Sequence, residues 1–174
     1  MTNIKLTYEY TLDSIKVINA SIDRIRSTFT SLIAVSGVLA NFGKDLPGYQ
    51  MITNCEYSRT NYPCLSCYIL KIIAYICLIF TIAIALKGLS PKTNGKIILP
   101  EQLICNEWNE IDEDDYLYSL VEYLEKETLL VLNKFRDYEA KRLNQAIWFL
   151  GATVILFGLD EILGSSLTVL GQSC

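Results

Sequence analysis

The residue types that could carry chemistry in this chain are cysteine and carboxylate, because its 174 residues include no histidine. Histidine is the commonest general base and metal ligand, and it activates most nucleophilic serines and cysteines. The usual hydrolase and zinc sites therefore lack their central group. We expect a protein that is not an enzyme, with no catalytic residue, no bound metal and no cofactor.

Three of the six cysteines lie close together in the sequence, namely Cys55, Cys64 and Cys67. Cys64 and Cys67 have the spacing of a dithiol motif, but the strand–helix–strand context of a thioredoxin site is missing. In an oxidising space, a disulfide between Cys55 and either Cys64 or Cys67 would tie the loop that contains them. The alternative is a thiol–disulfide membrane enzyme, which unchanged activity after serine replacement of Cys64 and Cys67 would exclude.

Four consecutive carboxylates, residues 112–115, precede a helical pattern. At a helix N-terminus such groups cap free N–H groups and suit the helix dipole. A calcium or magnesium site is the alternative, although the glycine and terminal glutamate of an EF-hand loop are missing. We therefore expect these carboxylates to begin a helix.

Five basic residues could converge into a pocket for anionic lipid headgroups or a nucleotide phosphate: Lys92, Lys96, Arg136, Lys141 and Arg142. The alternative is that they anchor the chain at the membrane interface. Proteins bind nucleic acid largely because their basic residues release counterions from the phosphates. The net charge of −4 means that this chain has no excess of basic residues for such binding. We expect no direct DNA binding.

The elements that position these side chains are three apolar runs, residues 27–43, 72–86 and 143–159, none of which contains a charge. With 51% hydrophobic and 20% charged residues, the chain is more apolar than a typical soluble domain. About 17–20 such residues span a bilayer. Lys71, next to the second run, lies near enough to an end to extend its ammonium to the interface. We therefore predict three transmembrane helices.

Two alternatives stay open for these runs. The first run contains several serines and threonines, so it could be an amphipathic helix that lies against the other two. All three could also be buried helices of a soluble bundle, although soluble core helices rarely lack charge over this length. The predicted organisation is a cytoplasmic amphipathic helix (1–26), transmembrane helix 1 (27–43), an outer loop (44–64), transmembrane helix 2 (65–87), a cytoplasmic segment with a long helix (88–142), transmembrane helix 3 (143–160) and a tail (161–174).

The segments outside the apolar runs also have helical periodicity. Apolar residues recur every three or four positions in residues 8–29 and again in residues 116–142. No proline interrupts residues 116–159, so one long helix should lead into the last run. The two stripes can pack on each other. The predicted fold class is therefore all-α, a membrane protein with about three transmembrane helices and a cytoplasmic helical hairpin or bundle.

Lysine and arginine predict the orientation, because basic residues concentrate on the cytoplasmic side of membrane proteins. They gather before the first run and between the second and third, whereas the loop 44–64 holds only Lys44 and Arg59. The N-terminus and the central segment should then be cytoplasmic. The first 25 residues lack the early apolar stretch of a secretory signal peptide.

The first run carries small and polar residues that allow close helix approach: Ser31, Ala34, Ser36, Gly37 and Asn41. Such a helix fits a position against protein or water better than one against lipid. We therefore expect this face to line a pore or an oligomer interface. No carboxylate lies inside any of the three runs, which argues against a proton relay at membrane depth.

The order of these parts resembles a known group of proteins. The sequence SIDRIRSTFTSLIAVSG leads into the first run, ALKGLSPK ends the second, and EAKRLNQAIWFLGATVILFG leads into the third. Over residues 10–160 the architecture is similar to that of small membrane effectors of bacterial anti-phage systems, the transmembrane Pycsar effectors and SLATT-type domains. The chain differs in its cysteine-bearing loop and apolar tail (162–170), and no nucleotide-sensor domain is recognised.

The resemblance implies a homo-oligomeric membrane effector that permeabilises or depolarises the bacterial inner membrane on activation, in antiviral defence. The trigger could be a nucleotide second messenger or a partner protein. The alternative function is an accessory membrane subunit that anchors or regulates a soluble partner complex. Such a subunit would form a stable hetero-complex and would conduct no ions by itself.

Overall fold

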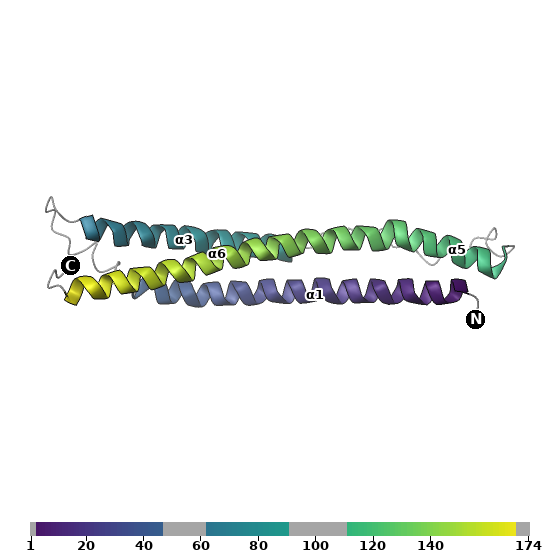
Figure 1. Cartoon of the computed structure of the whole chain (residues 1–174), viewed down its shortest axis with the longest axis horizontal. Helices are drawn as coiled ribbons and strands as arrows, with labels where there is room; N and C mark the ends of the chain where they lie inside the picture. Colours follow the sequence, from purple (N-terminus) through teal and green to yellow (C-terminus); the bar gives the residue numbers. More distant parts are fainter. Residues whose placement is uncertain (1–2, 47–61, 91–110, 170–174) are drawn as a thin grey trace. The chain divides into compact units, whose positions relative to one another are not determined.

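A computed structural model describes residues 3–46, 62–90 and 111–169 of the chain. These residues form helices throughout, apart from short turns at the helix ends (Figure 1). The elements are α1 (Asn3–Lys44), α3 (Tyr62–Leu89), α5 (Glu113–Tyr123), the π-helical segment η3 (Leu124–Leu129) and α6 (Leu130–Val169). The prediction of an all-α fold is confirmed.

Three stretches of helix are long and apolar enough to cross a membrane: Asn3–Lys44, Tyr68–Leu89 and Glu113–Ser166. The prediction of a multi-pass membrane protein is borne out at this level. The first apolar run is the end of the longer helix α1, as the helical periodicity of residues 8–29 indicated. Helices α5, η3 and α6 follow one another without a gap, so the helix expected over residues 116–159 is also continuous.

Two details of the long helix differ from the prediction. Residues Leu124–Leu129 have π-helical winding, which the sequence did not indicate. The tail expected from residue 161 is helical as far as Val169. Asp160 therefore lies nine residues before the end of α6.

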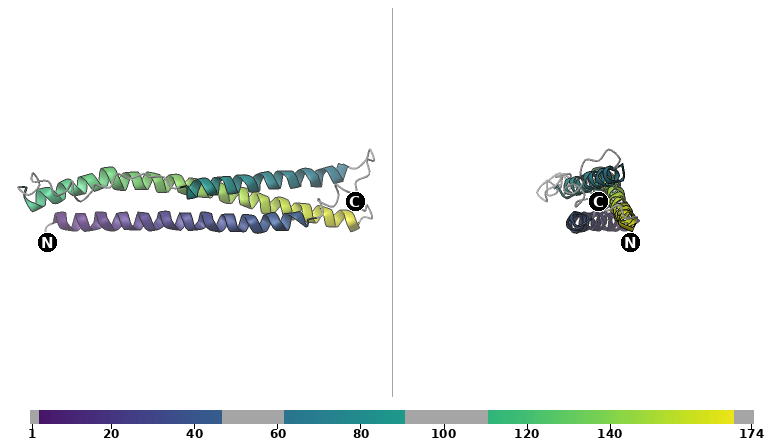
Figure 2. Two further views of the ribbon diagram at one scale, coloured as in Figure 1. Left: turned by 180° about the vertical axis from the view of Figure 1, so that it is seen from behind. Right: turned by 90° about the vertical axis from the view of Figure 1, so that its left-hand side faces the viewer.

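The chain divides into two compact units, and α1 and α6 each contribute to both. We call residues 27–90 and 142–174 the membrane unit, because they contain all three apolar runs. Residues 1–26 and 91–141, which carry most of the charges, are called the charged unit. The two views in Figure 2 show α3 beside the C-terminal half of α6 within the membrane unit.

The membrane unit is packed with the periodicity of a left-handed coiled coil. On α3 the buried positions are spaced alternately by three and four residues: Lys71, Ala74, Leu78, Thr81, Ala85 and Gly88. On α1 and just beyond its end, the buried positions Phe29, Leu32, Ser36, Gly43 and Leu46 fit the same spacing. A repeat of this kind averages 3.5 residues, which keeps one face of a supercoiled helix against its neighbours. The sequence thus selects one inward face on each helix.

In the charged unit, the apolar stripe of the N-terminal helix is turned inward as predicted. Ile18 and Ile22 are buried, whereas Asp23 and Arg24, which follow them, are exposed. Glu139 of α6 is also buried, and it makes a polar or electrostatic contact. The two amphipathic segments thus belong to one compact helical unit.

The carboxylates 112–115 mark a helix N-terminus, as expected. Asp112 is the N-cap residue of α5, and its carbonyl accepts a hydrogen bond from the backbone N–H of Tyr116 at 3.0 Å. Its side chain makes no capping hydrogen bond. Glu113, Asp114 and Asp115 occupy the first turn, where the helix dipole favours negative charge. Their effect on α5 is therefore electrostatic, without a side-chain cap.

Candidate functional site: the interior and the exposed faces of the membrane unit

Two glycines allow the helices of the membrane unit to approach closely. A Cβ atom at Gly43 of α1 would lie 2.7 Å from Cζ of Phe157 on α6 and 2.9 Å from the hydroxyl of Tyr75 on α3. A Cβ atom at Gly88 of α3 would clash with the fully buried ring of Phe29 on α1. The rings of Tyr75 and Phe157 meet edge to face, with centroids 5.8 Å apart. The space between the three spans is therefore filled by side chains.

These contacts define the two ends of the membrane unit. Phe29 packs near Gly88, whereas Gly43 packs near Tyr75, so α1 and α3 are antiparallel. We call the end at which α1 finishes and α3 begins the distal end. The opposite end, where α3 finishes at Leu89, is called the proximal end.

The interior of the membrane unit also contains hydroxyl groups, which lie between the helices and not on the outer surface. Thr81 and Thr153 are fully buried, and each donates a hydrogen bond to a carbonyl of its own helix, at 3.0 Å in both cases. Thr153 also lies 3.4 Å from the carbonyl oxygen of Ala74 on α3. The fully buried Oγ of Ser36 has no hydrogen-bond partner among the described residues. Of these hydroxyls, that of Thr153 therefore connects two spans, α6 and α3.

Lys71 of α3 carries a charge into this interior. Its side chain is buried against the other helices, because the residue is only 4% exposed. The ammonium donates a hydrogen bond to the carbonyl oxygen of Leu46, just beyond the end of α1, at 3.2 Å. Carbonyl groups at a helix C-terminus have no partner within the helix, and a cation stabilises them. Lys71 therefore connects α3 to the end of α1.

Asp160 of α6 supplies the opposite charge. It is completely buried, and its carboxylate acts electrostatically on the Lys71 ammonium, as does the exposed Asp45. Leu46, Ala74 and Phe157 form a buried apolar cluster beside this charge pair. All three spans thus meet at Lys71. Ionisable residues within membrane-spanning helices are costly to bury, so they commonly have a functional role.

The sequence contained a signal for this pair that the run-based analysis missed. Lys71 was taken as a flanking residue because it borders an uncharged run, and Asp160 because it follows one. The alternation of three and four residues on α3 places Lys71 in the same phase as Ala74 and Leu78. Position within the heptad pattern, and not distance from the end of a run, determines burial here.

The outer surface of the membrane unit is predominantly apolar, as a lipid-facing surface is. On α3 the exposed side chains are mainly large and aliphatic or aromatic: Ile69, Ile72, Ile73, Ile76, Ile79, Phe80 and Leu86. Trp148 of α6 is 74% exposed. Amphipathic aromatic rings of this kind are enriched at membrane interfaces. The surface of α3 in particular is suited to contact with lipid.

Helix α1 exposes a different surface. Of the five residues predicted to face a pore or a second copy, Ser31, Ala34, Gly37 and Asn41 are exposed. Ser36 differs from them, because it is buried among the three spans and is absent from this exposed face. A Cβ atom at Gly37 would meet nothing within 4 Å. We call the exposed residues Ser31, Ala34, Gly37 and Asn41 the α1 face.

Helix α6 exposes a second row of small and polar residues, which the sequence analysis did not identify. Asn144, Gly151, Gly158 and Ser165 follow one another at intervals of seven residues, and all four are exposed. Both glycines have open space where a Cβ atom would stand. We call these four residues the α6 face. The membrane unit therefore presents two small-residue faces from two different helices.

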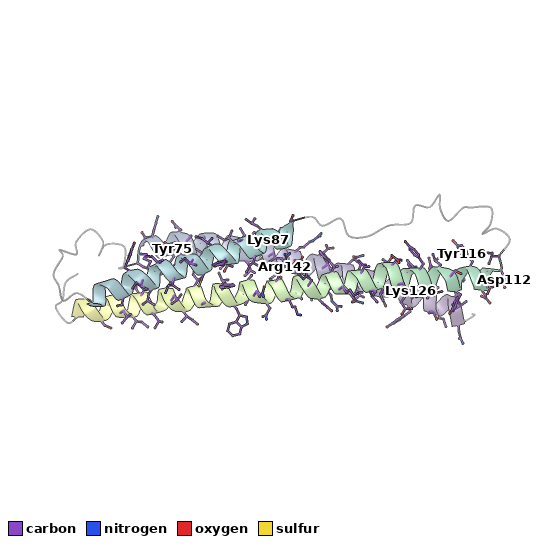
Figure 3. The ribbon with its side chains drawn as sticks, turned by 90° about the horizontal axis from the view of Figure 1, so that it is seen from above. Tyr75, Lys87, Asp112, Tyr116, Lys126 and Arg142 are labelled. Atoms are coloured by element: carbon purple, nitrogen blue, oxygen red, sulfur yellow. The ribbon has the colours of Figure 1, made fainter. Side chains whose placement is uncertain are left out.

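Three of the five predicted anionic-ligand residues are described, and all three lie on α6, so the predicted pocket stays a prediction. Lys92 and Lys96 lie outside the described residues. Arg136 pairs with the neighbouring Asp137 at 2.7 Å, and Lys141 is exposed. Arg136, Lys141 and Arg142 share one helix, where successive residues are rotated by roughly 100°, so their side chains leave it in different directions. Figure 3 shows Arg142 and, at the end of α3, Lys87.

The predicted disulfide also falls largely outside the described residues. Cys55 and the side chains of Cys64 and Cys67 are not described, so the pairing stays a prediction. The backbone at Cys64 and Cys67 belongs to the first turns of α3, which begins at Tyr62 and not at residue 65. The two cysteines are therefore one helical turn apart and not in an irregular loop.

Comparisons with known proteins add no assignment to this arrangement. No protein family model, no curated protein and no solved structure matches the chain. The functional argument therefore rests on the charges, the packing and the exposed faces of the described helices.

Proposed function

We propose that this chain is a non-enzymatic membrane protein that assembles into a homo-oligomer and permeabilises the membrane when it is activated. The observation that carries the proposal is the α1 face, a row of small and polar residues exposed on a candidate transmembrane helix. In lipid, small residues favour helix association because they let two backbones approach and pack closely. A face of this kind gains little from contact with lipid alone.

The packing inside the membrane unit indicates where a conduction path would run. Phe29, Leu32, Leu78 and Phe157 are buried between the spans, and the glycine positions are filled by neighbouring rings. One closed bundle therefore has no room for a row of water molecules. A path for ions would then lie between copies of the chain, and the α1 face supplies Ser31 and Asn41 as polar groups to such a path, beside the exposed Val38.

The presence of a second small-residue face supports a ring. If the α1 face of one copy contacts the α6 face of the next, the interface joins two different surfaces. Interfaces of this heterologous type build closed rings when the rotation between subunits closes. In this arrangement the subunits of a ring are equivalent, and each supplies the same helices to the centre.

The setting of this activity follows from the basic residues and from the resemblance described above. Arg24, Arg26, Lys87, Lys141 and Arg142 flank the proximal ends of the spans in the sequence, which favours a cytoplasmic position for the proximal end. We place the protein in the bacterial inner membrane with its N-terminus in the cytoplasm. We further propose that it acts in antiviral defence after activation by a nucleotide second messenger or a partner protein.

The direct test combines two measurements on one purified sample. The mass of the protein in detergent gives the number of copies, and release of ions or dye from liposomes gives the permeability. A defined oligomer that releases the contents supports the proposal. A monomer that leaves the liposomes intact contradicts the proposal. So does an oligomer that leaves them intact even when it is purified from cells in which the protein has been activated.

A substitution on the α1 face should weaken assembly. A leucine at Gly37 would hold two helix backbones apart, so for Gly37→Leu we expect self-association to weaken about tenfold, equivalent to about 1.4 kcal/mol. Analytical ultracentrifugation in detergent measures this change. The matched control is Ala83→Leu, which enlarges an exposed small residue on the lipid-facing surface of α3. Equal association of the Gly37→Leu and parent proteins would show that the α1 face is not the interface.

One observation favours the accessory-subunit function as a second candidate. The charged unit exposes large apolar side chains, among them Tyr10 (74%), Val17 (68%) and Tyr118 (63%). Apolar side chains on the surface of a water-exposed unit are suited to a protein partner. A stable complex with a soluble protein, together with intact liposomes in its presence, would favour this second function over the first.

A further inference from the structure

Two aromatic contacts set the register of α3 against α6 in the membrane unit. The ring centroids of Tyr75 and Phe157 are 5.8 Å apart, and those of Phe80 and Phe149 are 5.6 Å apart. Residue numbers rise along α3 as they fall along α6, so these two helices are antiparallel. Phe80 is 52% exposed and Phe149 is partly buried, which places the second contact at the outer surface. We call the residues in phase with Phe80 and Phe149 along this contact the α3–α6 seam.

One heptad from the stacked phenylalanines, the α3–α6 seam carries two cations. Lys87 is seven residues after Phe80 on α3, and Arg142 is seven residues before Phe149 on α6. In helices that pack with the heptad repeat described above, a step of seven residues returns to the same face. The two cations therefore repeat the juxtaposition of the two rings, about 10 Å nearer the proximal end. Burial agrees with this placement, because Lys87 is exposed as Phe80 is, and Arg142 is partly buried as Phe149 is. Figure 3 shows the two labelled cations at the same point along the two helices.

No described carboxylate of the membrane unit accompanies these two cations. The carboxylates that the structure describes in this unit lie toward the distal end: Asp45, Asp160 and Glu161. Glu139, which precedes Arg142 by one turn in the charged unit, is 3% exposed and is therefore not part of the exposed seam. Among the described residues, Lys87 makes no ion pair. Two like charges side by side repel each other, and an anion bound between them offsets that repulsion.

Beyond the phenylalanines the α3–α6 seam is apolar. The next heptad pairs Ile73 of α3 with Leu156 of α6, and Ile73 is 43% exposed. At 1.5 Å per residue, Lys87 lies about 10 Å from Phe80 and about 21 Å from Ile73 along the helix axis. The hydrocarbon of one leaflet is about 15 Å thick, half of a core of about 30 Å. A lipid chain that starts at the two cations therefore passes Phe80 and Phe149 and ends before Ile73.

We propose that the α3–α6 seam binds a phospholipid with an anionic headgroup. Lys87 and Arg142 bind the phosphate, to which a guanidinium donates paired hydrogen bonds. Phe80 and Phe149 contact the acyl chain. The exposed Gln145 lies between Arg142 and Phe149 on the same face of α6, where its amide N–H groups donate to the ester oxygens.

The position of this site in the membrane agrees with such a ligand. Basic sites between transmembrane helices bind anionic headgroups on the cytoplasmic side, where we place the proximal end. A phosphate without chains would use the two cations and leave the apolar part of the seam without a role. The inference requires that the spans lie in a membrane, but it does not depend on the proposed permeabilising activity.

The test measures lipid binding to the full chain, without any activating signal. Native mass spectrometry of the protein in detergent gives its affinity for phosphatidylglycerol, which is anionic, and for phosphatidylcholine, which has no net charge. The variants are Lys87→Gln, Arg142→Gln and the double variant with both changes. Lys141→Gln is the matched control, because Lys141 is an exposed cation next to Arg142 but is rotated from it by roughly 100° around α6.

The parent should bind phosphatidylglycerol more tightly than phosphatidylcholine. Each single variant should weaken binding of phosphatidylglycerol about fivefold, and the double variant about 25-fold, with binding of phosphatidylcholine unchanged. Lys141→Gln should behave as the parent does. Equal binding of the two lipids to the parent would overturn the proposal, and so would a loss in Lys141→Gln as large as that in Lys87→Gln. Because Lys87 is exposed, Lys87→Gln tests the site even if the change at the partly buried Arg142 prevents folding.

A second comparison separates a lipid from a free phosphate. Glycerol phosphate, which has the charge of the headgroup but no acyl chain, should fail to displace phosphatidylglycerol from the parent at equal concentration. Phe80→Ala should weaken binding of phosphatidylglycerol, whereas Ile79→Ala, a change at the neighbouring exposed residue off the seam, should not. Displacement by glycerol phosphate would overturn the assignment to a lipid, and so would parent-like binding in Phe80→Ala.

Discussion

Lys71→Met should lower the free energy of unfolding by about 1–3 kcal/mol, because it removes the cation that acts electrostatically on the buried carboxylate of Asp160 and donates a hydrogen bond to the chain just beyond α1. Asp160 is fully buried, so water cannot replace the lost partner while the bundle is closed. The hydrogen bond from Lys71 to the carbonyl of Leu46 is lost as well. Unfolding in detergent, followed by circular dichroism, measures the loss.

The informative comparison for this prediction is the double variant Lys71→Met/Asp160→Leu. With both charges removed, the site becomes an extension of the apolar cluster of Leu46, Ala74 and Phe157. Its stability should return to within about 1 kcal/mol of the parent, because the desolvation cost of both charges disappears with their attraction. A double variant that is as unstable as Lys71→Met would mean that shape, and not charge, determines stability at this position.

The elements of the fold could be predicted from the sequence because each depends on a local pattern. Uncharged runs gave the positions of the spans, and the spacing of Ile15, Ile18 and Ile22 gave the continuation of α1 outside them. The absence of proline between Tyr116 and Leu159 was sufficient to predict a continuous helix. Its π-helical segment could not be predicted, because the residues Leu124–Leu129 are ordinary helix formers.

The candidate site was less predictable because it depends on which residues face one another. Ser36 and Gly37 are adjacent and both small, yet one is fully buried and the other is exposed. The rotation of roughly 100° between neighbouring residues on a helix separates them, and the phase of that rotation is set by the packing of three helices together. Lys71 and Asp160 are 89 positions apart in the sequence, so their pairing is visible only after the spans are placed.

The same amino-acid change should have opposite effects at two glycines of the membrane unit. At Gly88, a methyl group would clash with the fully buried ring of Phe29, so Gly88→Ala should destabilise the bundle by about 1–3 kcal/mol. At Gly151, a methyl group meets nothing within 4 Å. Because alanine favours a helix more than glycine does, Gly151→Ala should stabilise the chain by up to about 1 kcal/mol.

The opposite signs separate packing inside one chain from packing between chains. Packing inside one chain is tested by the thermal unfolding midpoints of the two variants in a detergent that keeps the protein monomeric. A lower midpoint for Gly151→Ala than for the parent would contradict the open space at that position. Phe29→Leu should recover part of the stability lost in Gly88→Ala, since a smaller side chain relieves the clash. If Gly151→Ala instead lowers stability only where the protein is oligomeric, the α6 face contacts another copy, because no described residue of the same chain lies within 4 Å of the added methyl group.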